Sequence, residues 1–206
     1  MFRFLIKIFS RLLSIDFSRK YMMWFDIVYS SWIKSFMPNV ARSVLIEHGL
    51  KLVGEKSIFI SSGSILRKEG RLEAISGLNG DSFDSCIKIG SNCDIGPYFK
   101  INAINSISIG NNVLMGNQVT IIDQAHGQFN IIDISIPPAR RRLYSKGAVI
   151  IEDDVWICDK VTICAGVHIG KGTVIAANSV VTKDIPAYCM AAGIPAKVVK
   201  RLDINE

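Results

Sequence analysis

The sequence predicts an all-β solenoid of triangular cross-section, and three observations carry this prediction. Aliphatic residues recur at every sixth position in the second half of the chain: Ile151, Ile157, Ile163, Ile169, Ile175 and Val181. The position two residues before each of them is small or β-branched, and compact or turn-forming residues follow most of them. Neither an α-helix nor an ordinary strand pair keeps one face at this spacing. A chain that turns at each corner of a triangular coil does, because every side then buries one aliphatic residue.

The same rhythm begins earlier in the chain, before a two-residue slip. The anchors on either side of that slip are Ile89, Ile95, Ile101, Ile109, Met115 and Ile121. Short β-like pieces separated by glycines precede them and are typical of irregular first coils. We therefore expect the solenoid to occupy residues 50–186.

The rhythm stops between Ile121 and Ile151. An insertion into a solenoid must leave the core as an external loop, and such loops commonly carry function. We expect an extruded loop at residues 123–147.

The two ends of the chain differ from the repeat. Residues 1–49 show helical periodicity and many aromatic side chains, and residues 187–206 read as a C-terminal cap, a short helix or tail that hides the open edge. Within residues 1–17, apolar and basic residues recur at helical spacings, which allows either a helix packed on protein or a helix lying on an anionic membrane surface. The segment is too short and too charged to span a bilayer, and it lacks the cleavage site of a signal peptide.

Composition narrows the function classes. The net charge of +6 is modest and fits either a solvated surface or attraction for an anionic ligand such as a phosphorylated cofactor or an acidic lipid. No basic stripe with interleaved aromatics indicates nucleic acid. The five scattered cysteines lack metal-ligand spacing and read as buried small residues in a reducing compartment. We expect no metal and a cytoplasmic protein, peripheral to the inner face of the membrane if the N-terminal helix binds lipid.

One of the three histidines stands apart. His168 precedes an anchor and should face solvent, and His48 has no chemical partner nearby in the sequence. His126 lies at the root of the expected loop, beside Gly127 and three residues after Asp123, which is near enough to orient a ring nitrogen. Spacing alone leaves a catalytic histidine and a structural one equally open.

The repeat, the loop and two longer motifs resemble a known group of enzymes. The motifs are NNVLMGNQVTIID followed by His126, and the stretch SKGAVIIEDDVWICDKVTICAGVHIGKGTVIAANSVVTKDIPAYCMAAGIPAKVVKR. They are similar to hexapeptide-repeat acetyltransferases, in particular the bacterial polysaccharide O-antigen O-acetyltransferases and the galactoside and maltose acetyltransferases. The resemblance covers roughly residues 87–201. It implies a left-handed parallel β-helix and a homotrimer with active sites between subunits.

The resemblance also implies an activity. It gives His126 the role of general base in acetyl transfer from acetyl-CoA to a hydroxyl of a cell-surface polysaccharide sugar of the O-antigen or capsule type, with Asp123 beside it. Cofactor contacts carry over to six residues: Asp159, Ala177, Thr182, Lys183, Lys197 and Lys200. Without the resemblance, a solvated tail is the less favoured alternative for the two lysines, and Ala177 and Thr182 also read as turn residues that any coil requires.

Three positions depart from the family pattern. Cys158 replaces a glycine beside the expected pantetheine path, Cys164 replaces a proline, and Gln124 stands where related enzymes often carry a second histidine. His126 is therefore the sole candidate base.

The loop and the rival functions leave alternatives open. Arg140, Arg141 and Arg142 suit an acidic sugar, a nucleotide-sugar diphosphate, a lipid pyrophosphate or carboxylates of a neighbouring subunit. The rival functions are N-acetylation of a nucleotide-linked amino sugar and a non-catalytic solenoid scaffold. A zinc carbonic anhydrase is disfavoured, because neither His48 nor His168 is placed to share a metal with His126.

Overall fold

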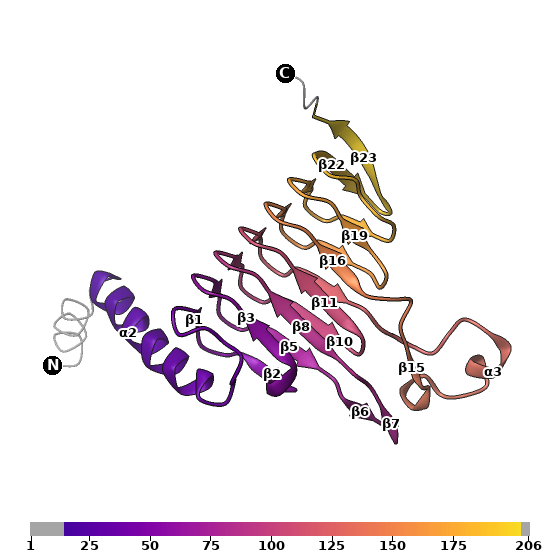
Figure 1. The fold of residues 1–206 in the computed structure, drawn as a ribbon, viewed down its shortest axis with the longest axis horizontal. Coiled ribbons are helices and arrows are strands. Elements are labelled where there is room, and N and C mark those ends of the chain that lie inside the picture. The colour runs from indigo at the N-terminus through magenta and orange to yellow at the C-terminus, as the bar shows by residue number, and fades with distance from the viewer. Residues whose placement is uncertain (1–14, 203–206) are drawn as a thin grey trace, which may run out of the picture.

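The computed structural model describes residues 15–202, and most of them form a tapering prism with three parallel sheets as its walls (Figure 1). The eight-stranded wall contains β1 (Leu45–Ile46), β4 (Ile65–Leu66), β9 (Asp94–Ile95), β12 (Leu114–Met115), β17 (Trp156–Ile157), β20 (Val174–Ile175), β22 (Cys189–Gly193) and β23 (Ala196–Arg201). The six-stranded wall contains β2 (Lys51–Val53), β5 (Arg71–Ala74), β10 (Lys100–Ala103), β13 (Thr120–Ile122), β18 (Thr162–Ile163) and β21 (Val180–Val181). The five-stranded wall contains β3 (Ile58–Ile60), β8 (Cys86–Ile89), β11 (Ser106–Ile109), β16 (Val149–Ile151) and β19 (His168–Ile169).

The register of the walls follows the sequence repeat. Ile151 pairs with Ile169, Ile157 with Ile175 and Ile163 with Val181, so each anchor stacks on the anchor three repeats later. All six anchors are at most 1% exposed and form the core of the prism. Each six-residue step moves the chain to the next wall, in the order five-stranded, eight-stranded, six-stranded. The predicted triangular solenoid is confirmed.

The two-residue slip in the sequence corresponds to one coil of the prism that is longer than the others. Ile89 pairs with Ile109 and Ile101 with Ile121, so this coil is two residues longer than the later ones. The extra residues lie at the corner between β10 and β11. Tight corners elsewhere use residues in the left-handed region, such as Asn112 (φ 55°) and Asp154 (φ 60°), which Asn and Asp tolerate better than most residues.

Helix α2 (Ile15–Lys34) lies beside β1 at the N-terminal end of the prism (Figure 1). It buries Ser30 and Ile33 against the first coils. Asp26 on this helix accepts hydrogen bonds from the backbone N–H of His48 at 2.9 Å and lies 2.8 Å from its Nδ1. His48 thus has a structural partner that its sequence neighbours did not reveal. In the described part of the chain, no helix is long and apolar enough to cross a bilayer.

The C-terminal end is a β-hairpin, and the expected short helix is wrong here. Strand β22 continues the eight-stranded wall, and β23 turns back antiparallel to it after Gly193 (φ 105°). The β-branched Val198 and Val199 suit a strand, and the pairing covers the edge that a helix was expected to hide. Strands β1 and β22 belong to the eight-stranded wall but lie outside residues 50–186. The division of the chain into residues 1–49, 50–186 and 187–206 therefore remains a proposal.

The short elements outside the walls gather on one side of the prism. A small hairpin of β6 (Gly77–Leu78) and β7 (Asp81–Ser82) projects there, and η1 (Glu55–Ser57) links two early strands. The segment between β13 and β16 leaves the prism on the same side and contains β14 (Ala125–His126), α3 (Ile131–Ile134), η2 (Pro138–Arg140) and β15 (Leu143–Tyr144) (Figure 1). All five cysteines are free thiols, and Cys93 and Cys189 are buried.

Candidate functional site

The extruded loop is held at its root by a two-stranded ribbon. Ala125 pairs with Tyr144 and His126 with Leu143 in the antiparallel pair β14–β15. Leu143 is only 5% exposed, whereas the side chain of His126 is exposed. Within the described residues, the imidazole of His126 has no hydrogen-bond or ion-pair partner. The loop therefore presents a histidine to solvent on an ordered ribbon.

Asp123 lies at the start of the loop and is fully buried. Its Oδ1 accepts a hydrogen bond from the N–H of Ile104 at 2.8 Å, and its Oδ2 accepts one from the N–H of Asn105 at 2.9 Å. Burial raises the pKa of Asp123, and the backbone hydrogen bonds partly oppose this. In the described part of the chain the carboxylate does not contact His126, contrary to the expectation that it orients the ring. The role we propose for Asp123 is indirect, because it fixes the backbone from which the loop departs.

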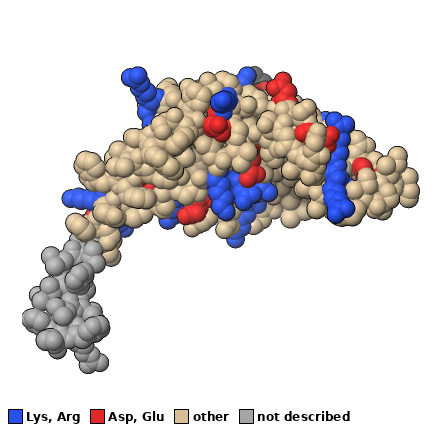
Figure 2. Space-filling view, turned by 90° about the horizontal axis from the view of Figure 1, so that it is seen from below, with Lys and Arg blue, Asp and Glu red and all other residues tan. Residues whose placement is uncertain are grey.

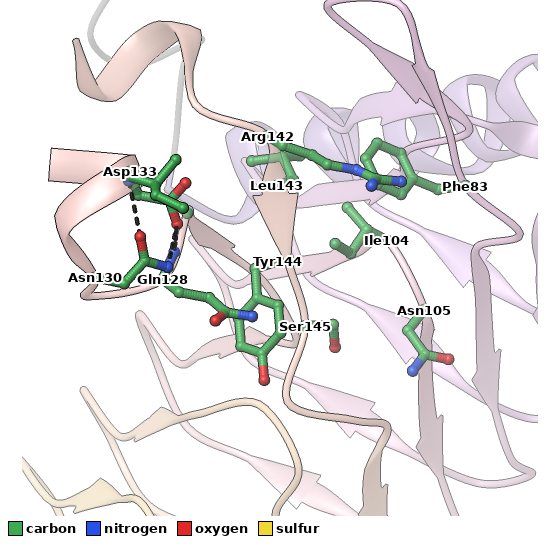
Figure 3. Close-up of a pocket in the computed structure, with 12 residues that line it drawn as sticks. Phe83, Ile104, Asn105, Gln128, Asn130, Asp133, Arg142, Leu143, Tyr144 and Ser145 are labelled. Atoms are coloured by element: carbon green, nitrogen blue, oxygen red, sulfur yellow. Dashed lines mark hydrogen bonds between the residues drawn. The ribbon is translucent and has the colours of Figure 1, made fainter. Parts of the chain in front are cut away.

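A first pocket, here called the hairpin-side pocket, lies between the loop and the residues that follow β7 (Figure 3). Its volume is about 560 Å³. Phe83, Ile104 and Leu143 supply apolar surface, while Tyr144, Gln128, Asn130 and Asn105 supply polar groups. The loop side of this pocket is braced by the N-cap of α3, where the Asn130 side chain accepts a hydrogen bond from the N–H of Asp133 at 2.8 Å. Mixed apolar and amide groups of this kind suit a polyhydroxylated ligand.

A second pocket, here called the wall-side pocket, lies on the other side of the ribbon and measures about 660 Å³. It joins the loop to the prism wall, because Ala125, Gly127 and Tyr144 line it together with Cys164 and Thr182. Gly127, immediately after His126, lines both pockets and has φ 81°. The two pockets therefore adjoin at Gly127, Gln128 and Tyr144, which line both, and His126 itself lines neither.

The three consecutive arginines have different environments. The Nε of Arg141 donates a hydrogen bond to the carbonyl of Ile136 at 2.9 Å and ties the loop to itself. Arg142 reaches along the hairpin-side pocket toward Phe83 and lies 3.2 Å from Asp81 (Figure 3). With its side chain 74% exposed, this ion pair contributes little to stability and leaves the guanidinium accessible to an anionic ligand.

The predicted cofactor residues lie on two edges of the prism. Thr182 and Lys183 follow β21, at the edge from which the loop also departs, and Thr182 lines the wall-side pocket. Asp159 and Ala177 follow β17 and β20, at the edge between the eight-stranded and six-stranded walls. The structure therefore brings Thr182 and the loop together, but the six-stranded wall separates them from Asp159 and Ala177.

Lys197 and Lys200 lie on β23 and not on a helix. Both side chains are exposed. A register shift opposite Met190 and Ala191 adds one residue to β23 between the two lysines. In a regular strand, residues three positions apart lie on opposite faces. The extra residue interrupts this alternation, so the spacing of the two lysines does not settle which faces they occupy.

An apolar ladder on the outer face of the eight-stranded wall escaped the sequence reasoning. Leu114 pairs with Trp156, Trp156 with Val174 and Val174 with Met190. Leu114, Trp156 and Met190 are 46%, 49% and 41% exposed. The signal in the sequence was the residue immediately before each buried anchor, which should face outward and is apolar at these positions.

The hexapeptide repeat matches a known family. Residues 148–183 match the family described as bacterial transferase hexapeptide (six repeats). The chain is 39% identical over 130 residues to the putative lipopolysaccharide biosynthesis O-acetyl transferase WbbJ of Escherichia coli, covering 61% of this chain and 66% of WbbJ. It is 34% identical over 134 residues to the galactoside O-acetyltransferase of Lactococcus lactis, covering 58% of this chain and 65% of that enzyme. The chain thus spans about two thirds or less of these relatives.

Solved structures agree on the fold. A hexapeptide-repeat-containing acetyltransferase of Vibrio cholerae is 32% identical, with a TM-score of 0.51, over 57% of this chain and 63% of that one. The N-acyltransferase AntD of Bacillus cereus, solved with dTDP and 3-hydroxybutyryl-CoA, has a TM-score of 0.68 over 85% of this chain and 89% of its own. Its 17% identity supports the fold alone. The resemblance to hexapeptide-repeat acetyltransferases and the left-handed parallel β-helix are thereby confirmed.

Proposed function

We propose that this hexapeptide-repeat chain is an acetyl-CoA-dependent O-acetyltransferase that modifies a sugar hydroxyl of a cell-surface polysaccharide, of the O-antigen or capsule type. The observation that carries the proposal is the position of His126. It stands exposed at the root of the loop that interrupts the repeat, directly before Gly127 and Gln128, which line both pockets. The similarity to WbbJ supports a saccharide acceptor.

The chemistry requires one base and two adjoining substrates. A neutral imidazole at His126 accepts the proton of the sugar hydroxyl as its oxygen attacks the thioester carbonyl of acetyl-CoA. The tetrahedral intermediate collapses to the acetyl ester, and the leaving thiolate of CoA takes the proton back from the imidazolium. Such proton transfer contributes on the order of 10²–10⁴-fold to the rate. Holding the two substrates together supplies a further part of the acceleration.

We assign the acceptor to the hairpin-side pocket. Tyr144 and Phe83 offer flat apolar surface to a sugar ring, and the side chains of Gln128 and Asn105 offer hydrogen bonds to its hydroxyls (Figure 3). Arg142 at the same pocket favours an acceptor that carries a carboxylate or phosphate. This pocket adjoins His126 through Gly127 and Gln128.

We assign the donor to an assembly of subunits. Thr182 and Lys183 lie on the loop edge, whereas Asp159 and Ala177 lie on the opposite edge of the six-stranded wall. A homotrimer in which these edges meet would complete a site from two subunits. Each six-stranded wall would then face outward, and the eight-stranded wall of one subunit would face the five-stranded wall of the next.

Exposed apolar residues support this arrangement. The eight-stranded wall carries the apolar ladder, and the five-stranded wall carries Phe59 and Ile150, which are 40% and 43% exposed. A ring of this kind would cover both surfaces. We also propose a cytoplasmic location, which the five free cysteines support.

N-acetylation of a nucleotide-linked amino sugar is the second candidate. A tetrahydropyridine dicarboxylate N-acetyltransferase of Clostridium perfringens is 54% identical over 59 residues, which is 29% of this chain. Because O- and N-acetyl transfer can use the same donor and base, this short match favours a common acetyl donor and does not distinguish the acceptors.

Mass spectrometry of the host polysaccharide tests the proposal. We expect the repeat unit to lose the mass of one acetyl group when the gene is deleted. The wild-type gene should restore that mass and the His126→Ala gene should not. An unchanged repeat unit, or restoration by the His126→Ala gene, would contradict it.

A kinetic experiment tests the donor assignment. We expect Lys197→Ala combined with Lys200→Ala to raise the KM for acetyl-CoA about tenfold or more, because two exposed cations beside nucleotide phosphates are removed. Lys56→Ala on η1 is the matched control and should change neither KM. A rise confined to the KM for the acceptor would show that the phosphates of acetyl-CoA do not bind at Lys197 and Lys200.

A further inference from the structure

Helix α2 is apolar on the side that faces away from the prism as well as on the side that faces it. Ile33 and Ser30 are 6% and 2% exposed against the first coils. Tyr21, Trp24, Val28 and Trp32 recur at spacings of three and four residues and form one outward stripe. These four side chains are 62%, 65%, 62% and 56% exposed. The helix lies at the N-terminal end of the stack, clear of the extruded loop (Figure 1).

The charged side chains of this helix include both signs with basic groups in excess, since Asp16 is exposed in its first turn. Arg19 and Lys20 are exposed on the same helix. Two further acidic side chains between the helix and the prism have partners of their own, because Asp26 bonds to His48 at 2.8 Å and Glu47 lies 3.1 Å from Arg67. Figure 2 shows a mostly uncharged surface at this end in that view, with basic side chains projecting from it and little acidic surface.

The N-terminal part of the sequence carries a net positive charge. Residues 1–49 contain seven Lys or Arg against three Asp or Glu, so they carry four of the six net positive charges of the chain. Three of the basic residues, Arg3, Lys7 and Arg11, directly precede α2 in the sequence. A positively charged, apolar end complements an anionic and partly apolar partner.

We propose that the outer face of α2 docks flat on an anionic lipid surface. Trp and Tyr are enriched where a bilayer meets water, because their rings are apolar and their N–H and O–H groups remain hydrated. The stripe from Tyr21 to Trp32 extends about 16 Å along the helix, which suits a helix in the plane of the headgroups. Lys20, exposed at the flank of the stripe, adds attraction for anionic lipids, whereas Arg19 lines a hollow with Asp26, Glu47 and Arg67 on the prism side of the helix.

Docking through α2 has a consequence for the proposed function. The prism would be held at its N-terminal end, beside a membrane where a lipid-linked saccharide is accessible. The binding proposal itself does not depend on the acetyl transfer reaction, because it is measured with lipid vesicles alone.

Vesicle co-sedimentation of the full-length protein tests the proposal. We expect the protein to bind vesicles containing phosphatidylglycerol, and Trp24→Glu with Trp32→Glu to weaken this binding tenfold or more. Lys20→Glu should weaken it on the order of fivefold, only with anionic vesicles and less at high salt. Phe129→Glu is the matched control, since Phe129 is 100% exposed on the loop and should not matter.

Circular dichroism and light scattering accompany this measurement. Variants that keep the wild-type spectrum and mass while losing vesicle binding support the proposal. Wild-type protein that ignores anionic vesicles, or a tryptophan double variant that binds them normally, overturns it. A double variant that falls to a smaller species without lipid also overturns it, because a second copy of the chain would then cover the stripe.

Discussion

At the scale of single residues, the three histidines differ by their partners. His48 is held by Asp26 at 2.8 Å, and the Nε2 of His168 lies 2.8 Å from Glu152. His126 is exposed on the loop ribbon without such a partner among the described residues. A general base needs a ring nitrogen that is free to accept the proton of the substrate, so the difference between His126 and the other two histidines supports the role that we propose for His126.

Asp123 provides a stability prediction at the same scale. Asp123→Asn should lower the free energy of unfolding by about 1–3 kcal/mol. The two carboxylate oxygens now accept hydrogen bonds from two backbone N–H groups, and in the variant an amide NH₂ would replace one of these oxygens and leave one N–H without an acceptor. Urea denaturation measures this.

The matched control is Asp84→Asn, an exposed carboxylate on the same side of the prism, which should change the free energy by less than about 0.5 kcal/mol. Equal effects of the two substitutions would show that the buried acceptor pair does not stabilise the loop root.

At the scale of the elements, carboxylates fasten one coil to the next. Glu152 accepts a hydrogen bond from the N–H of Lys171 at 2.7 Å, and Asp154 lies 3.3 Å from the Nζ of Lys171. Asn112 donates to Asp154 at 2.9 Å from the preceding coil. These contacts lie at corners between walls, where backbone hydrogen bonds also join the coils, such as the one from the N–H of Asp154 to the carbonyl of Asn111 at 2.9 Å.

The pH dependence of stability follows from Glu152. The hydrogen bonds from Lys171 and then His168 lower the pKa of Glu152 below its ordinary 4.5. An acid with a lowered pKa in the folded state stabilises the protein fully above its ordinary pKa, and this contribution is lost as the pH falls through the lowered value.

Glu152→Gln should therefore be less stable than the wild type at pH 7, and the gap should narrow as the pH falls below 4.5. Urea midpoints at pH 7 and at pH 3.5 measure the gap. A gap of the same size at both pH values would show that ionisation of Glu152 contributes nothing.

The elements also show what the sequence can predict. The anchors are encoded locally, one in six, so the walls and the position of the loop could be derived from spacing alone. The hairpin β22–β23 could not be derived in this way. Its strands form because β22 pairs with β20 at the end of the eight-stranded wall, and this pairing depends on the folded wall and not on local spacing. The hairpin-side pocket was missed for a related reason: Phe83 and Asn105 meet Tyr144 only through the fold. The indirect role of Asp123 depends likewise on a backbone corner distant in sequence.

At the scale of the whole molecule, assembly connects the two edges of the site. The apolar ladder places Trp156 in the middle of the surface that we assign to the subunit interface. Trp156→Glu should shift the protein from trimer to monomer and reduce acetyl transfer at least tenfold, although His126 is untouched. Light scattering coupled to gel filtration measures the mass.

Val53→Glu on the outward-facing six-stranded wall is the matched control, since Val53 is similarly exposed at 48%. It should leave the trimer intact. A Trp156→Glu trimer with full activity would place the subunit interface on another surface.

The central claim is that the break in the repeat supplies the base, and the rate of acetyl transfer by His126→Ala tests it most directly. His168→Ala serves as the control, because His168 is also exposed but lies on β19 and not on the loop; since it pairs with Ile150 on the five-stranded wall, light scattering confirms that this variant is still a trimer. We expect His126→Ala to lose about 10²–10⁴-fold in kcat while its trimer and its affinity for CoA are unchanged, and His168→Ala to remain active. A His126→Ala enzyme that turns over acetyl-CoA at the wild-type rate would contradict the account.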